Sequence, residues 1–363
     1  MKNSEHKRSE LDKFFGDQLS RWTLACDNFR ALKGVQVKEF PMRGLKVKLQ
    51  HNPARIVSSA AKTDSASLKA RACFLCRENR PAEQFNLTFE GRKGKSYDIL
   101  VNPYPIFPNH LVIALASHRE QSIWSRYVDM LDLARNYQGY TFFYNGPRCG
   151  ASAPDHHHFQ ATLNGRMPLE LDVDGLLDMA VRYPQNAELQ FLASVRDAQL
   201  YWYNRFARGI FALRARTAKS MAKLFYRLLD CVTVPEGEKE PLFNLITYYK
   251  SGEYRSIVIF RTGHRSHHYF SDGPDHLTMS PGCADVAGMF IVPVKEDFEK
   301  ITPELLCEMM DEVTLGEEAE QKIIRKLTRT QPQLEVGILS APEIAFEMIS
   351  DGAGVQRASY REG

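Results

Sequence analysis

Three consecutive histidines, a phenylalanine and a glutamine follow one another near the middle of the sequence. In an extended strand the side chains alternate between two faces, so His156, His158 and Gln160 should share one face and His157 and Phe159 the other. A neutral imidazole held in one tautomer is a good nucleophile toward phosphorus, and a neighbouring amide can donate to a phosphate oxygen in the transition state. The stretch therefore favours phosphorus chemistry, with a surface histidine cluster or an adventitious metal site as the alternative.

The loop before these histidines contains small residues of the kind that surround an anion. Gly146, Gly150 and Ser152 offer backbone amides and a hydroxyl that can gather around phosphate oxygens. This loop makes phosphorus chemistry the stronger of the two interpretations.

Cys73 and Cys76 form a C-x-x-C pair, which can be one half of a tetrahedral zinc site. Such a site needs two more soft or borderline ligands from elsewhere in the chain. A redox role would require a thioredoxin-like βαβ context, which the surrounding pattern lacks. Seven cysteines in 363 residues indicate reduced thiols with a metal or redox site rather than a disulfide framework.

These residues need a scaffold, and the first half of the chain predicts one made of strands and helices. Strands are expected over the short apolar or alternating runs 45–49, 97–102, 111–116, 140–145 and 156–163. Helical spacing of apolar residues predicts helices over 10–31 and 123–137, and the polar stretch 51–70 is expected to be a loop. Strands joined by turns and one helix indicate an α+β fold with a largely antiparallel sheet and flanking helices.

The second half repeats this plan loosely. Strands are expected over 199–203, 209–214 and 286–294, a hairpin over 243–249 and 255–260, helices over 217–231, 303–313 and 317–328, and closing edge strands over 334–339 and 344–349. The linker is expected between residues 164 and 198. We therefore predict two lobes, residues 1–170 and residues 171–363.

The composition excludes several classes of protein. Hydrophobic residues make up 44% and charged residues 25% of the chain, which is normal for a globular protein and excludes a mostly disordered one. The formal charge of +3 is too mild to predict a nucleic-acid-binding protein. The sequence shows no apolar run long enough for a membrane span and no secretory signal, so we expect a cytoplasmic protein.

The histidine block resembles the active-site motif of the histidine-triad superfamily, specifically its transferase branch, where the pattern is H-x-H-x-Q. That branch includes galactose-1-phosphate uridylyltransferases, diadenosine tetraphosphate phosphorylases and GDP-hexose phosphorylases. The segment 102–113 also resembles the branch, because an N-P-[FY]-P turn precedes its nucleotide-lining strand. The resemblance covers residues 70–165 with specificity and 200–315 loosely, and it implies two histidine-triad-like lobes, the first of which is catalytic.

The resemblance implies roles for the residues that match the motif. The second histidine of the pattern becomes covalently nucleotidylated in this branch, and in this sequence that residue is His158. Gln160 would contact the phosphate through its amide, and Ser152 and Gly150 would add further phosphate contacts. Asn145 would contact the nucleotide or sugar. Asn102 would do the same, although a turn-forming role before proline is an equal alternative.

The resemblance also implies a zinc site and contacts from the second lobe. In the uridylyltransferases a C-x-x-C pair joins two histidines that correspond to His118 and His156, with His110 and His157 as the alternative assignments here. A structural zinc ion on these four residues would hold the catalytic strand to the N-terminal segment. In the second lobe, Arg261 and Arg265 are candidate contacts to the second phosphate or the sugar, and a solvated hairpin end is the alternative.

The function implied is that of a nucleotidyltransferase of the phosphorylase type that acts on a nucleoside diphosphate sugar. The uridylyltransferases typically have proline between the two histidines, whereas this sequence has His157 there and Phe159 after His158, a form closer to the GDP-hexose phosphorylases. A diadenosine polyphosphate phosphorylase and a non-catalytic nucleotide-binding scaffold are the alternatives. The expected partners are a nucleotide or nucleotide sugar and an acceptor phosphate or sugar phosphate, and related enzymes often form homodimers.

Overall fold

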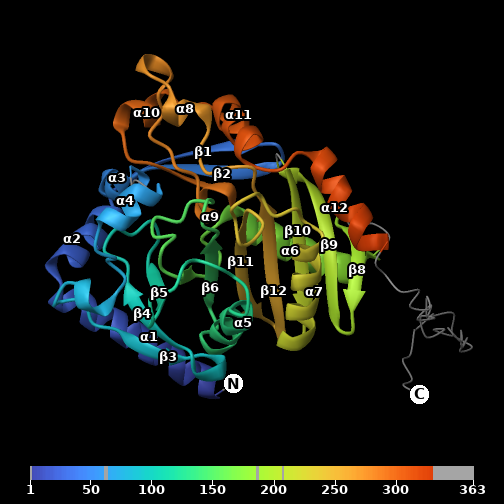
Figure 1. Ribbon diagram of the computed structural model, residues 1–363, viewed down its shortest axis with the longest axis horizontal. Coiled ribbons are helices and arrows are strands. Elements are labelled where there is room, and N and C mark those ends of the chain that lie inside the picture. The colour runs from blue at the N-terminus through green and yellow to red at the C-terminus, as the bar shows by residue number, and fades with distance from the viewer. Residues whose placement is uncertain (1, 61–63, 185–187, 207, 330–363) are drawn as a thin grey trace, which may run out of the picture. The chain divides into compact units, whose positions relative to one another are not determined.

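A ten-stranded sheet forms the centre of the structure, a computed structural model that describes residues 2–60, 64–184, 188–206 and 208–329 (Figure 1). Its members and those of a smaller sheet are, in chain order, β1 (Gln36–Met42), β2 (Leu45–His51), β3 (Leu87–Glu90), β4 (Ser96–Val101), β5 (Leu111–Leu115), β6 (Tyr140–Asn145), β7 (His158–Leu163), β8 (Gln190–Val195), β9 (Ala198–Phe206), β10 (Arg208–Ala215), β11 (Phe243–Lys250), β12 (Glu253–Phe260) and β13 (Met289–Val292).

The helices surround this sheet. They are α1 (Lys2–Arg21), α2 (Thr23–Leu32), α3 (Ile56–Ser59), α4 (Ser65–Ala70), α5 (Tyr127–Asn136), α6 (Pro168–Arg182), α7 (Ala218–Asp230), α8 (His267–Phe270), α9 (Cys283–Val286), α10 (Lys295–Lys300), α11 (Pro303–Val313) and α12 (Glu317–Arg329). Among the described helices, none is long and apolar enough to cross a bilayer.

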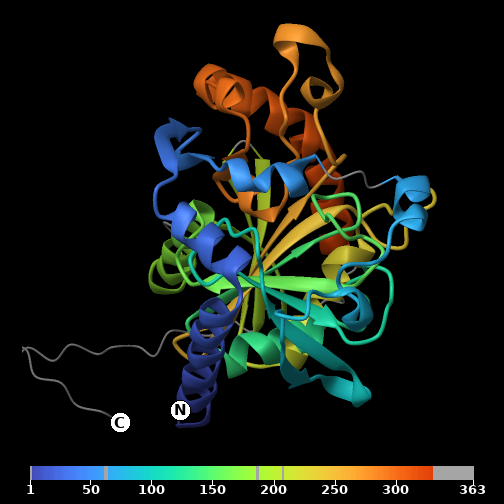
Figure 2. The ribbon, with the colours of Figure 1, turned by 90° about the vertical axis from the view of Figure 1, so that its left-hand side faces the viewer.

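The large sheet is antiparallel between all neighbours and has the order β3-β4-β5-β7-β6-β11-β12-β10-β9-β8. The smaller sheet has the order β1-β2-β13, with β13 parallel to β2. Helices α10 and α11 contact the small sheet, and their orange and red segments lie at the same end of the molecule in Figure 2.

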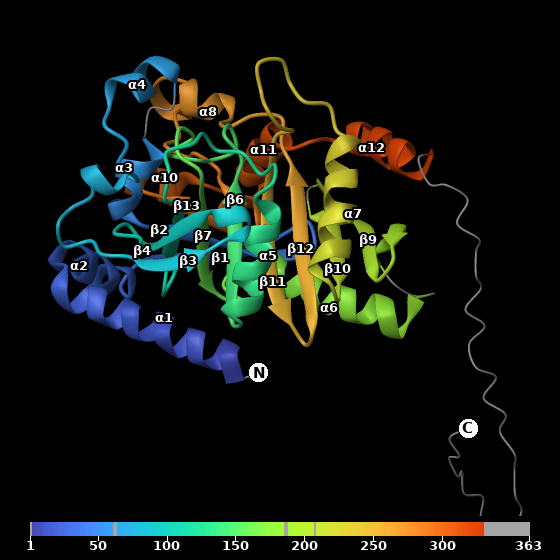
Figure 3. The ribbon, with the colours of Figure 1, turned by 60° about the horizontal axis from the view of Figure 1, so that its bottom comes forward.

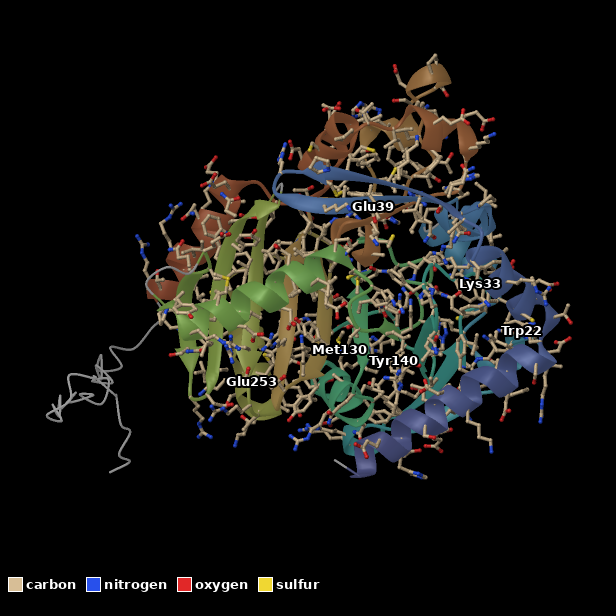
Figure 4. The ribbon with its side chains drawn as sticks, turned by 180° about the vertical axis from the view of Figure 1, so that it is seen from behind. Trp22, Lys33, Glu39, Met130, Tyr140 and Glu253 are labelled. Atoms are coloured by element: carbon tan, nitrogen blue, oxygen red, sulfur yellow. The ribbon has the colours of Figure 1, made fainter. Side chains whose placement is uncertain are left out.

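Both faces of the large sheet are covered, so its central strands are buried over most of their length. All six residues of β6 are buried. Phe142 and Tyr144 enter one hydrophobic core with α5 and α7, which lie side by side in Figure 3, whereas Phe143 enters a second core. Helix α6 belongs to this second core and crosses the opposite face, as Figure 4 shows. Alternation along the strands therefore supplies apolar side chains to two layers at once.

The central pair β6 and β11 joins strands from the two halves of the chain. Asn145 at the end of β6 lies opposite Asn244 of β11. Strand β7 lies between β5 and β6, so the histidine strand is interior to the sheet and held by hydrogen bonds on both sides. The division into lobes at residue 170 stays a prediction.

The predicted α+β fold with its largely antiparallel sheet is confirmed, and the expected hairpin is β11–β12. Its two-residue turn places Ser251 and Gly252 at φ values of 52° and 84°, which matches the twist of the flanking strands. The predicted strands over 97–102, 111–116 and 140–145 are β4, β5 and β6, with a difference of at most one residue at either end.

Several predictions of secondary structure were wrong. The segment 164–198, within which the linker was expected, contains α6 and β8, and the position of the linker stays a prediction. The helix expected over 10–31 is interrupted at Trp22 (Figure 4), whose side chain is buried. The expected loop 51–70 contains α3 and α4, and the strand expected over 286–294 is limited to β13. The edge strands expected over 334–339 and 344–349 lie outside the described residues.

Candidate active site

His158 is the first residue of β7, and its imidazole is held in one tautomer. Its Nδ1–H donates to the backbone carbonyl of His156 at 2.8 Å, since a carbonyl oxygen can only accept. The side chain is 5% exposed, and burial lowers the pKa of His158 to about 4. Within the described part of the chain Nε2 has no hydrogen-bond partner. At neutral pH His158 therefore offers an unprotonated Nε2, the form needed for attack on phosphorus.

His158 lines a cavity of about 580 Å³. A cavity of this volume lies within the usual range for small-molecule sites. The structure brings most of the predicted catalytic and substrate-binding residues to its wall. They are Asn102, Asn145, Gly150, Ser152, His158 and Gln160.

Gln160 is oriented by His110, a residue weighed in the sequence only as an alternative metal ligand. The backbone N–H of Ile106 donates to Nδ1 of His110 at 3.2 Å, so the ring proton is on Nε2. That Nε2–H donates to Oε1 of Gln160 at 2.8 Å. Burial lowers the pKa of His110 to about 3, which keeps it neutral. With its oxygen occupied, Gln160 is left with its amide N–H groups as donors beside the cavity.

Gln121 holds the backbone of the catalytic strand and was missed in the sequence. Its Oε1 accepts from the backbone N–H of His158 at 2.8 Å, and its Nε2 donates to the carbonyls of His158 at 3.0 Å and Asn145 at 2.9 Å. Gln121 is 2% exposed, so these bonds are protected from water. No local signal distinguishes this glutamine from a surface residue before a helix.

Asn145 connects the glycine-containing loop with the segment before α9. Its Nδ2 donates to Gly150 O at 3.4 Å, and its Oδ1 accepts from Asn244 Nδ2 at 2.9 Å and from the backbone N–H of Cys283 at 2.7 Å. Gly150 has φ +94°, and a Cβ there would lie 2.3 Å from Gly282 Cα. Only glycine permits this close approach of two backbones at the cavity wall.

Asn102 lines the cavity and also forms the turn considered for it in the sequence. Its Oδ1 accepts from the backbone N–H of Tyr104 at 2.9 Å. The two interpretations of this residue are therefore compatible.

Two arginines on the cavity wall were also missed. Nη1 of Arg55 donates to Tyr104 O at 2.8 Å, and burial lowers the pKa of Arg55 to about 10, which leaves it charged at neutral pH. Nη2 of Arg71 donates to Asp155 Oδ1 at 2.7 Å, while its Nη1 is buried without a hydrogen-bond partner among the described residues. These guanidinium groups give the cavity positive charge suited to a polyphosphate.

The two arginines predicted from the second half have different positions. Arg265 lines a small hollow of about 30 Å³ together with Arg55, Ser152 and Gly150, all of which also line the main cavity. The structure does not bring Arg261 to either space. Its five N–H donors bond to acceptors within the protein, which are Val313 O, Asn244 Oδ1, Pro281 O, Gly263 O and His264 O. With no N–H left for a phosphate, Arg261 supports the surrounding backbone.

Cys73, Cys76, His118 and His156 come together as a cluster in which one ligand atom from each residue lies within 4.8 Å of the others. Cys73 Sγ is 3.3 Å from His156 Nδ1, and Cys76 Sγ is 3.2 Å from His118 Nδ1. Nε2 of His156 donates to Leu115 O at 2.7 Å, which leaves Nδ1 as a ligand. Two sulfur and two imidazole donors fit a tetrahedral metal ion.

The alternative metal ligands are not part of this cluster. His157 packs against Phe159 on the other face of the strand, with ring centroids 4.7 Å apart, and His110 bonds to Gln160. The alternation expected for residues 156–160 is therefore present.

The comparisons with known proteins agree with this fold. Residues 14–163 match a family described as a domain of unknown function (DUF4922). No curated protein matches the chain. The structure is similar to yeast Ap4A phosphorylase Apa2, with a TM-score of 0.52 and 18% identity over 81% of this chain and 97% of that one. The AMP complex of Apa2 gives a TM-score of 0.51 and 17% identity over 82% and 97% of the two chains.

An ADP-glucose phosphorylase from Arabidopsis thaliana is more distant, with a TM-score of 0.37 and 14% identity over 77% of this chain and 99% of that one. The assignment of the fold therefore rests on the two Apa2 structures. The chain shares its fold with yeast Ap4A phosphorylase Apa2.

Proposed function

We propose that this protein is a nucleotidyltransferase of the phosphorylase type that works through a covalent nucleotidyl-histidine intermediate. The observation that carries the proposal is His158, a neutral imidazole held through Nδ1 and placed on the wall of a cavity with two arginines. The fold shared with an Ap4A phosphorylase supports it.

The first step is attack of His158 Nε2 on the α-phosphorus of a phosphoanhydride substrate. The new N–P bond forms as the bond from phosphorus to the bridging oxygen breaks, and the leaving phosphate or sugar phosphate departs with that electron pair. In the second step an oxygen of the acceptor, orthophosphate or a sugar phosphate, attacks the same phosphorus and releases neutral His158. The two-step path conserves the phosphoanhydride energy and never requires both anions to be bound around one phosphorus.

The surrounding residues bind and orient the phosphates. The amide N–H of Gln160 points to the charge that develops on the α-phosphate oxygens, because His110 occupies the amide oxygen. Ser152 and the backbone around Gly150 line the same wall, and Arg55 and Arg71 offset the negative charge of the substrate.

The substrate class that we propose is a nucleoside polyphosphate or a nucleotide sugar. The comparisons give no specific support to the GDP-hexose preference that the motif suggests. A dinucleoside polyphosphate is as good a candidate as a nucleotide sugar, since the similar structure is that of an Ap4A phosphorylase. Trp22, Leu24, Phe74 and Leu75 give the cavity an apolar wall suited to a base. Cytoplasmic location and a homodimer stay predictions of the sequence.

We further propose that the Cys73 cluster binds zinc, which prefers tetrahedral sites of thiolates and imidazoles. The zinc ion would act structurally, by fixing the segment of Cys73 and Cys76 to the side chain of His156. No step of the reaction needs to pass through it.

The decisive experiment is a search for the intermediate. The protein would be incubated with α-³²P-labelled Ap4A, GDP-mannose and ADP-glucose, and the denatured protein examined for an acid-labile, alkali-stable label. We expect labelling with at least one substrate, its loss in His158→Asn, and its retention in His276→Asn, because His276 does not line the cavity. Reversible binding without any adduct would instead support the scaffold alternative and overturn the proposal.

A further inference from the structure

A second cluster of metal-ligating side chains lies outside the cavity, between α8 and α11. It consists of His267, His268 and Glu308, and one ligand atom from each lies within 4.8 Å of the others. We propose that this cluster binds a divalent transition metal ion of the Zn²⁺, Co²⁺ or Ni²⁺ type. The proposal does not depend on the proposed function, because it concerns residues that do not line the main cavity.

His268 is the residue that points most clearly to a ligand. It is 8% exposed, and its Nδ1–H donates to the backbone carbonyl of Asp275 at 3.2 Å. This bond occupies Nδ1 and leaves Nε2 as the nitrogen that faces the cluster. Among the described residues this buried Nε2 has no hydrogen-bond partner, although Glu308 Oε1 is 3.5 Å away. Leaving a buried polar atom unsatisfied is unfavourable, and a metal ion between the two groups would satisfy both.

His267 is held in the manner of a metal-ligating histidine. Its Nδ1 lies 2.9 Å from Glu312 Oε2, and its backbone N–H donates to Glu312 Oε1 at 2.7 Å. Histidine ligands in metal sites usually donate their other ring N–H to a carboxylate or a backbone carbonyl. His267 has the carboxylate partner, Glu312, and His268 has the carbonyl partner, Asp275 O. The ring centroids of the two histidines are 3.9 Å apart.

The donor set decides which metals fit. Two imidazoles and one carboxylate suit borderline divalent ions such as Zn²⁺, whereas Ca²⁺ and Mg²⁺ prefer oxygen ligands. Glu308 and Glu312 are four residues apart on α11 and so share one face of that helix. Glu308 is exposed, so water can complete the coordination.

A metal ion here would tie α8 to α11. The segment between β12 and α9 also carries Arg265 and Ser280, which line the small hollow beside the cavity. Metal binding would therefore hold this side of the cavity in place without supplying a ligand to it.

Cobalt titration tests the proposal and separates the two clusters. Co²⁺ bound to the cysteines gives an intense sulfur-to-metal charge-transfer band, whereas Co²⁺ bound to imidazole and carboxylate does not. Isothermal titration of the full chain counts the Co²⁺ equivalents, and absorption spectra recorded at the same ratios show which of them produce the sulfur band. We expect one equivalent to bind without producing this band. Glu308→Gln and His268→Ala should abolish that equivalent, and Glu312→Gln should weaken it about 10–100-fold.

The control is His276→Ala, a histidine on the same segment that bonds to Ser271 O and lies outside the cluster. It should bind Co²⁺ as the wild type does. Glu308→Gln changes an exposed side chain, so it remains informative even if His268→Ala fails to fold. Absence of a sulfur-free equivalent in the wild type, or its persistence in Glu308→Gln, would overturn the proposal.

Discussion

The backbone carbonyl of His156 accepts the Nδ1 hydrogen of His158 at 2.8 Å, while the imidazole of His156 lies 3.3 Å from the sulfur of Cys73. One residue thus connects the cluster of Cys73, Cys76, His118 and His156 with the proposed nucleophile. Its side chain belongs to the cluster and its main chain selects the tautomer of the next histidine on that face. The position of the cluster therefore bears directly on the chemistry proposed for His158.

Removal of the proposed zinc ion should weaken catalysis as well as stability. Cys76→Ser or prolonged chelation should abolish binding of one zinc equivalent, lower the melting temperature and slow nucleotidylation of His158 about 10–100-fold, because the carbonyl of His156 loses its support. Metal analysis, thermal unfolding and single-turnover labelling provide the measurements. Cys26→Ser, outside the cluster, should match the wild type in all three. Full activity in the metal-free protein would contradict the connection.

His110 should act on the reaction only through Gln160. Gln160→Ala removes a transition-state donor and should slow nucleotidylation about 10²–10³-fold. His110→Asn should slow it less, because the amide of Gln160 remains but is no longer held in one orientation. The two losses should not add, since both changes remove the same oriented donor.

The measurement is the single-turnover rate for both variants and for the double variant. If the double variant were slower than Gln160→Ala by the full factor seen for His110→Asn, the two residues would act independently. Thermal unfolding should accompany these rates, because His110 is fully buried.

Acid should destabilise the protein through its buried histidines. Unfolded histidines bind a proton below about pH 6.5, whereas burial lowers the pKa of His158 to about 4 and that of His110 to about 3. Between these values the unfolded state binds more protons, so stability present above pH 6.5 is lost as the pH falls toward 4. Melting temperatures measured from pH 8 to 4 should show this decline.

His158→Gln should show a smaller decline in melting temperature over the same pH range, since one of the titrating groups is removed.

Nucleotidylation of the wild type should stay constant from pH 8 to about 5, because His158 is already neutral there. A loss of rate centred near pH 6.5 would mean that His158 titrates like an exposed histidine.

Gly150→Ala should damage the cavity wall. The new Cβ would lie 2.3 Å from Gly282 Cα, and φ is +94°, so the loop must move. We expect a loss of stability of about 1–3 kcal/mol together with a higher KM for the nucleotide. Gly175→Ala in α6 is the matched control, because nothing lies within 4 Å of its Cβ position and alanine favours a helix. Equal effects of the two substitutions would refute the close approach proposed at Gly150.

Local pattern in the sequence determined which residues share a face of the histidine strand and where the strands around it lie. His158 and Gln160 reach the cavity while Phe159 enters the core, because alternation is a property of any extended chain. The C-x-x-C pair and the histidine motif could also be recognised in the sequence, because the residues of each lie close together in the chain and their spacing resembles that of a known family.

Contacts between distant segments were decided only by the tertiary structure. Gln121 bonds to the backbone of His158, 37 residues away, and nothing near Gln121 in the sequence announces this partner. Arg71 lines the cavity, whereas the N–H groups of Arg261 all donate to acceptors within the protein, up to 52 residues away in the sequence. A polar side chain carries the same donors wherever it lies, so whether they serve a substrate or the protein depends on which acceptors the fold brings near.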